Sequence, residues 1–573
     1  MITIEVNHRS AQANEGERLL DVLRREGIKV PTLCHIPGLP PSGACRLCVV
    51  EIEGRDDLVP SCSFPVQPDL KVLTHSARAV EARRMIVELL LSDHPDDCLH
   101  CAANDSCQLL AISKELAIHG RRFPHHQNPI PRDVSSPAIV RDPAKCILCG
   151  RCVRVCEEIQ GVAAIDFIGR GSRARVGTAF EEGLNVSSCV NCGQCILVCP
   201  TGALTENADI EYVQAALRDP EKIVVVQHAP SVSVTLAEFF GHDPGEDAQG
   251  ALTAVLRRFG FDRVFDTAFS ADLTIMEEAS ELVARIQKGG PLPLLTSCSP
   301  GWVTFLEQCY PDMLENVSSC KSPQQMLGAI VKSYYAQCEG IDSERIVSVA
   351  IMPCTAKKLE ARRPHMASGG LADVDAVLTT RELAQMIRLR GLTLDGVGTA
   401  EPDLPFGTRS SAGKLFGATG GVTEAALRTA HHLITGEQMP ERQVRALRGL
   451  DGRKEAHVQI GDVTVGVAVC SDLSAAGALM EEVRDGRDDL HFIEVMTCPG
   501  GCIAGGGQPV HGDREAIAAR MRRLYQIDDE EVLRTSHENP AIQELYQRFL
   551  GQPLSERSHA LLHTRYSPRK VLV

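Results

Sequence analysis

The sequence predicts a multidomain chain of α+β and α/β class, in which small cysteine-bearing units precede a large α/β domain. Three observations lead to this prediction. A chain of 573 residues is too long for one hydrophobic core. Fifteen of its 23 cysteines lie between Cys34 and Cys199, and strand and helix patterns alternate from about residue 209. The net charge of −15 argues against nucleic acid as a partner, and the absence of a run of about 18 apolar residues argues against membrane insertion.

Residues 1–78 are predicted to form a small sheet-rich domain. Apolar and polar residues alternate over 2–6, a helical pattern follows at 17–26, and strand patterns recur at 49–53 and 70–74. Its cysteine spacing resembles that of plant-type 2Fe–2S ferredoxins, which have a β-grasp fold, although their first spacing is shorter. A zinc site is the alternative. The ligands expected for one 2Fe–2S cluster are Cys34, Cys45, Cys48 and Cys62.

Residues 79–120 are expected to carry a second cluster. Ser76 can cap a helix that runs to about Leu91, and a short ligand segment follows it. This segment resembles the His-ligated 4Fe–4S segment that hydrogenases share with the large electron-transfer subunit of respiratory complex I. An imidazole ligand should raise the reduction potential relative to four thiolates. The expected ligands are His94, Cys98, Cys101 and Cys107.

Residues 138–208, beyond a proline-containing connector at 124–133, contain an internal repeat. CILCGRCVRVC and CVNCGQCILVCP both have the C-x2-C-x2-C-x3-C spacing of two-cluster bacterial ferredoxins. In that arrangement the fourth cysteine of each run reaches the cluster of the other run, whereas a zinc ribbon would use cysteine pairs. One 4Fe–4S cluster is assigned to Cys146, Cys149, Cys152 and Cys199, and the other to Cys189, Cys192, Cys195 and Cys156.

Residues 209–510 are predicted to form an α/β domain, followed by a polar helical tail over 511–573. Three strand patterns end in cysteine-bearing loops: TSCSPGW, MPCTAKK and MTCPGGC. Because functional loops of α/β sheets lie beyond the carboxyl ends of the strands, these loops are expected to meet. The strand patterns lie at 223–226, 264–265, 292–295, 346–351, 376–378, 463–469 and 492–495.

These three loops closely resemble the active-site signatures of FeFe (iron-only) hydrogenases. ADLTIMEE, SPQQ, FGATGGV and SHENPAIQELY extend the resemblance over nearly the whole chain. It implies reversible reduction of protons to H2, with electrons relayed along the N-terminal clusters. It also implies an active site in which a 4Fe–4S cubane shares a cysteine sulfur with a two-iron unit carrying CO, cyanide and a bridging dithiolate.

The resemblance assigns roles to individual residues. Cys354, Cys498 and Cys502 would bind the cubane, with Cys502 as the bridge to the two-iron unit. Lys357 would donate to one iron-bound cyanide and Ser231 to the other. The residues expected to line a dry pocket around the irons are Gln324, Met352, Phe416 and Met496.

A proton route is implied as well. Cys298 holds the position of the family's thiol relay. Glu278 and Glu281 share one helix face, with Ser318 between them and Arg285 one turn further on. Carboxyl groups suit this task because burial raises their pKa towards the operating pH.

One position departs from the family pattern. Where the family has a cubane-ligating cysteine before proline, this chain has Ser299. A hydroxyl is a harder and less acidic ligand than a thiol, so iron–sulfur clusters disfavour it. Either Ser299 occupies the fourth corner as ligand or near-ligand, or Cys298 rearranges to ligate and leaves the proton route.

Two further alternatives concern function: a hydrogen sensor or electron carrier with low turnover, and a relative of hydrogenases in cytosolic iron–sulfur assembly. The expected redox partner is either ferredoxin or flavin-containing subunits that react with NAD(P), which would make a hetero-oligomer. The strand-like N-terminus and the many thiolates indicate a reducing cytoplasm. Four thiols outside these motifs are expected to be buried apolar residues: Cys309, Cys320, Cys338 and Cys470.

Overall fold

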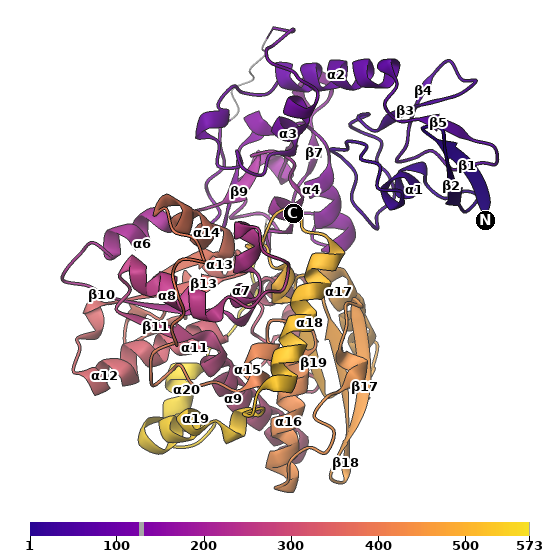
Figure 1. Ribbon diagram of the computed structural model, residues 1–573. Coiled ribbons are helices and arrows are strands. Elements are labelled where there is room, and N and C mark those ends of the chain that lie inside the picture. Colours follow the sequence, from indigo (N-terminus) through magenta and orange to yellow (C-terminus); the bar gives the residue numbers. More distant parts are fainter. Residues whose placement is uncertain (125–130, 572–573) are drawn as a thin grey trace.

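The structure is a computed structural model that describes residues 1–124 and 131–571. The connector expected at 124–133 therefore lies mostly outside the described residues. The N-terminal units lie at one end of the large domain, and the C-terminal tail runs along the large domain (Figure 1). None of the described helices is both long and apolar enough to span a bilayer. This arrangement confirms the multidomain α/β prediction.

The first unit is a five-stranded mixed sheet packed on one helix. Leu19, Leu20 and Leu23 of that helix are fully buried against the sheet, because they recur at helical spacing on one face. The strand order is β2-β1-β5-β3-β4, and β1 and β5 are parallel. The elements are β1 (Ile2–Val6), β2 (Arg9–Ala13), α1 (Leu19–Arg25), β3 (Val49–Ile52), β4 (Leu58–Pro60) and β5 (Lys71–Leu73).

The next units are built of short elements between cysteine loops. Ser76 caps α2 as expected, since its hydroxyl accepts a hydrogen bond from the Ala79 amide at 3.2 Å. Strand β6 pairs with β9, and β7 pairs with β8. The elements are α2 (Ala77–Ser92), α3 (Gln108–Glu115), β6 (Ile139–Arg141), α4 (Arg151–Arg154), β7 (Asp166–Ile168), β8 (Arg175–Gly177), α5 (Gln194–Val198) and β9 (Leu204–Glu206).

The large domain contains two four-stranded sheets where the sequence suggested one. The first, in the order β11-β10-β13-β16, is parallel throughout. The second, in the order β12-β19-β18-β17, is parallel except for its antiparallel edge strand β17. The strands are β10 (Ile223–His228), β11 (Arg263–Asp266), β12 (Leu294–Leu295), β13 (Ile346–Met352), β16 (Ala376–Thr379), β17 (Arg453–Ile460), β18 (Val463–Cys470) and β19 (Phe492–Val495); β14 (Ala367–Ser368) and β15 (Leu371–Ala372) form a separate small hairpin.

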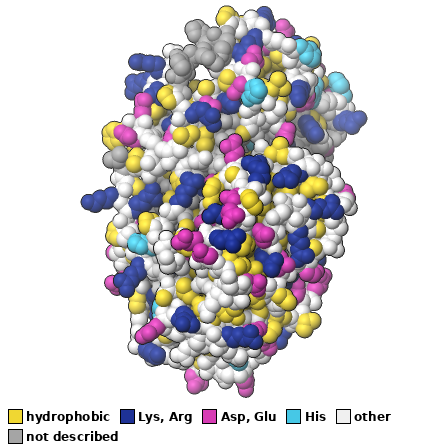
Figure 2. Space-filling view, turned by 90° about the vertical axis from the view of Figure 1, so that its left-hand side faces the viewer, with side chains coloured by type: hydrophobic (Ala, Val, Ile, Leu, Met, Phe, Trp, Pro, Cys, Tyr) yellow, Lys and Arg dark blue, Asp and Glu magenta, His cyan; other side chains and the backbone are white. Residues whose placement is uncertain are grey.

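On the face shown in Figure 2, positive and negative side chains are interspersed, and neither sign forms a large patch.

Helices pack around both sheets, and the longest described helix is α9, of 22 residues. The helices are α6 (Ile210–Ala216), α7 (Pro230–Ser233), α8 (Gln249–Phe259), α9 (Thr267–Lys288), α10 (Pro300–Cys309), α11 (Pro323–Ile330), α12 (Ala336–Glu339), α13 (Ala356–Ala361), α14 (Thr380–Leu389), α15 (Ser411–Leu415), α16 (Gly421–Thr435) and α17 (Leu473–Arg484), followed in the tail by α18 (Arg514–Glu530), α19 (Pro540–Leu545) and α20 (Glu556–Leu562).

Candidate active site

A cavity with about 800 Å³ of empty space lies where the loops after β12, β13 and β19 meet. Two of these strands belong to one sheet and the third to the other, so the site lies between the sheets. The cavity has an almost entirely apolar lining that also includes Lys357 and several thiols. Its lining includes the predicted residues Ser231, Cys298, Ser299, Gln324, Met352, Cys354, Lys357, Phe416, Met496, Cys498 and Cys502.

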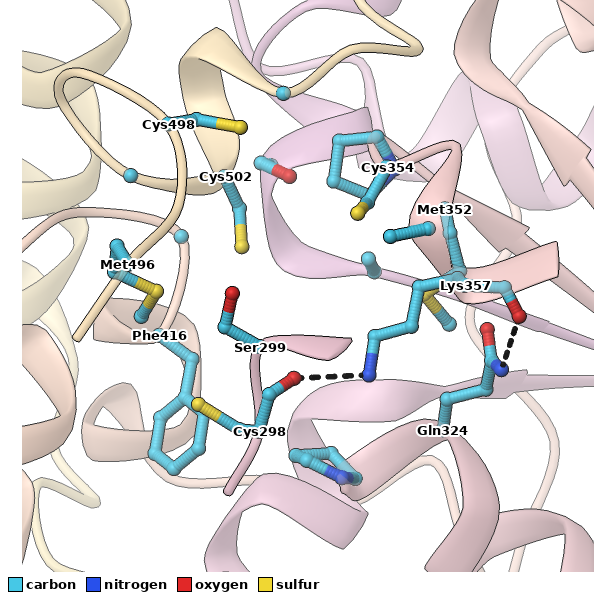
Figure 3. A pocket seen from close by; sticks show the side chains of 18 of the residues that line it. Cys298, Ser299, Gln324, Met352, Cys354, Lys357, Phe416, Met496, Cys498 and Cys502 are labelled. Carbon is cyan, nitrogen blue, oxygen red and sulfur yellow. Dashed lines mark hydrogen bonds between the residues drawn. The ribbon is translucent and has the colours of Figure 1, made fainter. Parts of the chain in front are cut away.

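Three thiols face one space within this cavity: those of Cys354, Cys498 and Cys502 (Figure 3). Gly500 and Gly501 have φ of 101° and 94°, a conformation that L side chains rarely adopt, and this turn brings Cys498 and Cys502 to the same side. Burial raises the pKa of Cys502 to about 12. Such thiols hold their protons until a metal displaces them, and they are soft ligands suited to an iron–sulfur centre.

Ser299 shares this space, and Cys298 does not. The Ser299 hydroxyl points towards the three thiols, whereas the Cys298 thiol lies beside the Phe416 ring (Figure 3). The backbone at Ser299 is extended, which directs consecutive side chains to opposite sides. The Ser299 oxygen lies 2.8 Å from the hydroxyl of Thr497, a neighbour that the sequence motifs did not single out.

Hydrogen-bond donors line the opposite wall. Lys357 donates from Nζ to the Cys298 carbonyl at 3.0 Å and pairs with the Glu360 carboxylate at 3.0 Å. The Ser231 hydroxyl is fully buried, lines the cavity and has no hydrogen-bond partner in the described part of the chain. An orphaned buried hydroxyl of this kind fits a polar ligand that occupies the cavity. The thiols and these donors therefore fit the cubane and two-iron group.

Four of the predicted proton-route residues lie together on and beside α9: Glu278, Ser318, Glu281 and Arg285. The Ser318 hydroxyl donates to Glu281 Oε2 at 2.9 Å, and Arg285 donates to Glu281 Oε1 at 2.7 Å. Burial, with the nearby charge of Glu281, raises the pKa of Glu278 to about 8. Glu281 and Arg285 line an open surface pocket at the end of α9. Glu278 can thus hold a proton at neutral pH between the Cys298 side and the exit.

Two cavities in the third unit enclose the two expected cubane ligand sets. One is lined by Cys146, Cys149, Cys152 and Cys199, and the other by Cys156, Cys189, Cys192 and Cys195. The fourth cysteine of each run thus lies with the three of the other run. Cys192 lines both its own cavity and the active-site cavity, so these two sites adjoin.

The other expected cluster ligands lie in the first two units, where Cys34, Cys48 and Cys62 are buried and Cys45 is half-buried. The thiols of Cys34 and Cys45 interact with each other, and so do those of Cys48 and Cys62. In the second segment, His94 is 7% exposed and its Nδ1 has no partner among residues 1–124 and 131–571, while Cys98, Cys101 and Cys107 are half-buried. Across the described ranges, no three His, Cys, Asp or Glu side chains converge on a single metal ion. An iron–sulfur core holds its ligands further apart than one ion does.

The prediction for the four other thiols was half right. Cys320 and Cys470 are buried, but Cys309 and Cys338 are exposed. The two exposed thiols lie at the ends of helices α10 and α12, where the chain turns to the surface.

Comparison with known proteins matches each unit to an iron–sulfur or hydrogenase family. Residues 222–506 match the C-terminal domain of the iron-only hydrogenase large subunit, and 514–569 match the iron hydrogenase small subunit. The N-terminal units match a 2Fe-2S binding domain (1–77), an NADH-ubiquinone oxidoreductase-G iron-sulfur binding region (83–122) and the ferredoxin-like domain of NADH-quinone oxidoreductase subunit 3 (136–205).

Relatives that match over nearly the whole chain are also hydrogenases. The NADP-reducing hydrogenase subunit HndD of Solidesulfovibrio fructosivorans is 46% identical, with 100% of both chains covered. Iron hydrogenase 1 of Clostridium pasteurianum is 38% identical, covering 99% of this chain and 100% of its own. The structure of a variant of the apo FeFe-hydrogenase HydA1 from Chlamydomonas reinhardtii is 41% identical with a TM-score of 0.58, covering 64% of this chain and 100% of that one.

The fold and the site define an iron–sulfur oxidoreductase with a buried thiol-lined centre. The chain belongs to the iron-only hydrogenase family. It is an enzyme of reversible H2 chemistry, with 2Fe–2S and 4Fe–4S domains ahead of its catalytic domain.

Proposed function

We propose that this chain interconverts protons and H2 in the cavity between its two sheets, with electrons relayed through one 2Fe–2S and three accessory 4Fe–4S clusters on the assigned ligands. The observation that carries the proposal is the meeting of Cys354, Cys498 and Cys502 in one buried cavity that adjoins Cys192. When bound there, the cubane and two-iron group would supply the redox centre and the open iron position for hydrogen.

The side chains of the cavity hold and supply protons. Cys298 carries a proton on its thiol, whose pKa burial raises, and exchanges it with Glu278. Ser318 and Glu281 pass it on to the surface beside Arg285. Lys357 and Ser231 would donate to the polar ligands of the two-iron group, while Met352, Met496 and Phe416 keep water away. Ser299 would hold the fourth cubane position.

The redox partner is proposed to be a flavin-containing subunit that reacts with NADP. This choice is supported by the relative HndD, which is named as a subunit of an NADP-reducing hydrogenase and matches over the full chain. Ferredoxin is the second candidate. Purification of the native complex from its reducing cytoplasmic environment distinguishes them, because a co-purifying flavoprotein supports the first and its absence supports the second.

Dye-linked H2 uptake by the fully matured protein tests the enzymatic assignment. We expect turnover in the parent protein and its loss in Cys502→Ala, with the accessory clusters retained. Infrared bands of CO and cyanide on iron establish that maturation succeeded. Absence of turnover in a sample with these bands would favour the hydrogen-sensing alternative.

A further inference from the structure

Arg151 is a buried cation at the junction of three cluster-bearing units. It begins α4, between Cys149 and Cys152, and is 6% exposed. Its guanidinium donates to Gln108 Oε1 in α3 at 2.8 Å and to the Val198 carbonyl in α5 at 3.4 Å. A third bond, at 3.5 Å, reaches the Thr32 carbonyl of the first unit. All these acceptors are neutral.

A buried guanidinium without a carboxylate is costly, because an unpaired charge loses its hydration. Within residues 1–124 and 131–571, no Asp or Glu forms an ion pair with Arg151, and its Nε has no partner. Arg151 stands between the ligands Cys149 and Cys152, and its acceptors Val198 and Thr32 lie next to Cys199 and two residues before Cys34. The charge therefore lies against two cluster sites.

Lys145, which directly precedes Cys146 but whose side chain reaches Asp97 and Cys101 of the second cluster segment, provides a contrast. It is 9% exposed, and its Nζ forms an ion pair with Asp97 at 2.9 Å. The Asp97 carboxylate neutralises this cation locally. Of these two buried cations, Arg151 is the one whose charge has no carboxylate counterpart among the described residues.

We propose that Arg151 is the shared counter-cation of the 2Fe–2S cluster and of the cubane held by Cys146, Cys149, Cys152 and Cys199, and raises the reduction potentials of both. The inference rests on the proposed cluster ligands. A positive charge in a medium of low polarity stabilises the reduced, more negative state of a nearby cluster. Through its bonds to Thr32 and Val198, the same side chain holds the two sites in register for electron exchange.

Potentiometric titration of the full holoenzyme, followed by EPR, tests this role. We expect Arg151→Gln to lower both potentials, each by about a tenfold change in the one-electron equilibrium constant, or about 59 mV. Arg151→Lys, which keeps the charge, should retain most of both values. The matched control Lys145→Met should leave the 2Fe–2S potential unchanged and shift the cubane by less than Arg151→Gln does.

Unchanged potentials in Arg151→Gln with intact clusters would overturn the inference, as would an equal effect of Lys145→Met on the 2Fe–2S potential. If Arg151→Gln does not retain its clusters, Gln108→Glu serves instead. This substitution keeps Arg151 in place and pairs its charge with a carboxylate, so both reduction potentials should fall. If neither potential changes, the proposed role of Arg151 is refuted. Lack of these cluster signals in the parent protein would instead refute the proposed ligand sets.

Discussion

Ser299 places a hydroxyl where three cysteine thiols share one space. The extended backbone turns Cys298 away from them, so that a single loop directs an oxygen to the three thiols and a thiol to the Phe416 ring. In the proposed function, this alternation of two neighbouring side chains separates a cubane ligand from a proton carrier.

Replacement of Ser299 tests its place at the cubane. In protein carrying the cubane without the two-iron unit, we expect Ser299→Ala to change the EPR signal and the potential of the cubane. Thr497→Val, which removes only the hydroxyl 2.8 Å away, should weaken cluster binding by about tenfold. An unchanged cubane in Ser299→Ala would contradict the assignment and favour Cys298 as ligand.

Glu278 is predicted to limit proton delivery. Glu278→Gln should slow H2 formation by about 10²-fold to 10⁴-fold, while the cubane EPR signal stays the same. Because the pKa of Glu278 is raised to about 8, the carboxyl carries its proton below that pH and loses it above. H2 formation should therefore decline above about pH 8. The exposed Glu315→Gln is the control, and an equal loss there would contradict the role.

At the scale of elements, Glu277 fastens the tail to α9. Its fully buried carboxylate accepts hydrogen bonds from Tyr546, Ser558 and the Leu554 amide, and lies 3.1 Å from His563 Nε2. Burial alone would raise the pKa of Glu277, but these partners lower it below its ordinary value. Its contribution to stability is therefore present above the ordinary pKa and is lost as the pH falls through the lowered value.

Glu277→Ala should lower the free energy of unfolding by about 3–5 kcal/mol, because it leaves buried hydrogen-bond donors without an acceptor. Hydrogen exchange of residues 540–563 should rise with it. Glu544→Ala breaks an exposed pair with Arg548 and should change stability by less than about 0.5 kcal/mol. Equal losses in the free energy of unfolding for the two replacements would contradict a stabilising role of the buried Glu277 carboxylate.

Most elements of the fold follow from local patterns, and their assembly does not. Apolar periodicity identified the buried strands β10, β13 and β19 because each is almost continuously apolar. It did not identify β17, whose half-exposed RKEAHVQI pattern depends on pairing with β18. The division into two sheets is set by long-range packing that no local pattern records.

The same distinction holds for the site. Spacing and family motifs pointed to the thiols, to Lys357 and to the proton-route carboxyls. They did not point to Thr497 or Arg151, because each contacts a residue that is distant in sequence. Such partners become visible only when the loops are folded together.

At the scale of the whole molecule, the third unit is seated directly on the catalytic loops. The Thr355 hydroxyl donates to the Asn191 carbonyl at 2.7 Å, and Gln194 donates to the Ala504 carbonyl at 3.1 Å. A Cβ on Gly506 would lie 2.2 Å from the Cys192 carbonyl oxygen, so this contact between the two units leaves no room for a side chain at position 506.

Gly506→Ala should consequently displace the Cys189–Cys195 loop. We expect a loss of about 1–3 kcal/mol in stability and slower reduction of the accessory clusters by H2 in stopped-flow measurements. Gly512→Ala is the matched control, because its Cβ would meet nothing closer than 3.6 Å. Equal rates of cluster reduction in Gly506→Ala and the parent protein would contradict close packing between the third unit and the catalytic loops.

The open pocket beside Glu281 and Arg285 is also lined by His559 of α20, and α20 lies at the other end of the large domain from the N-terminal units (Figure 1). On the proposed routes, electrons would therefore enter at one end of the molecule and protons at the other. A redox protein bound to the N-terminal units would leave the pocket beside Glu281 and Arg285 open to bulk water. The turnover rate of such a complex would therefore still depend on the buffer around that pocket.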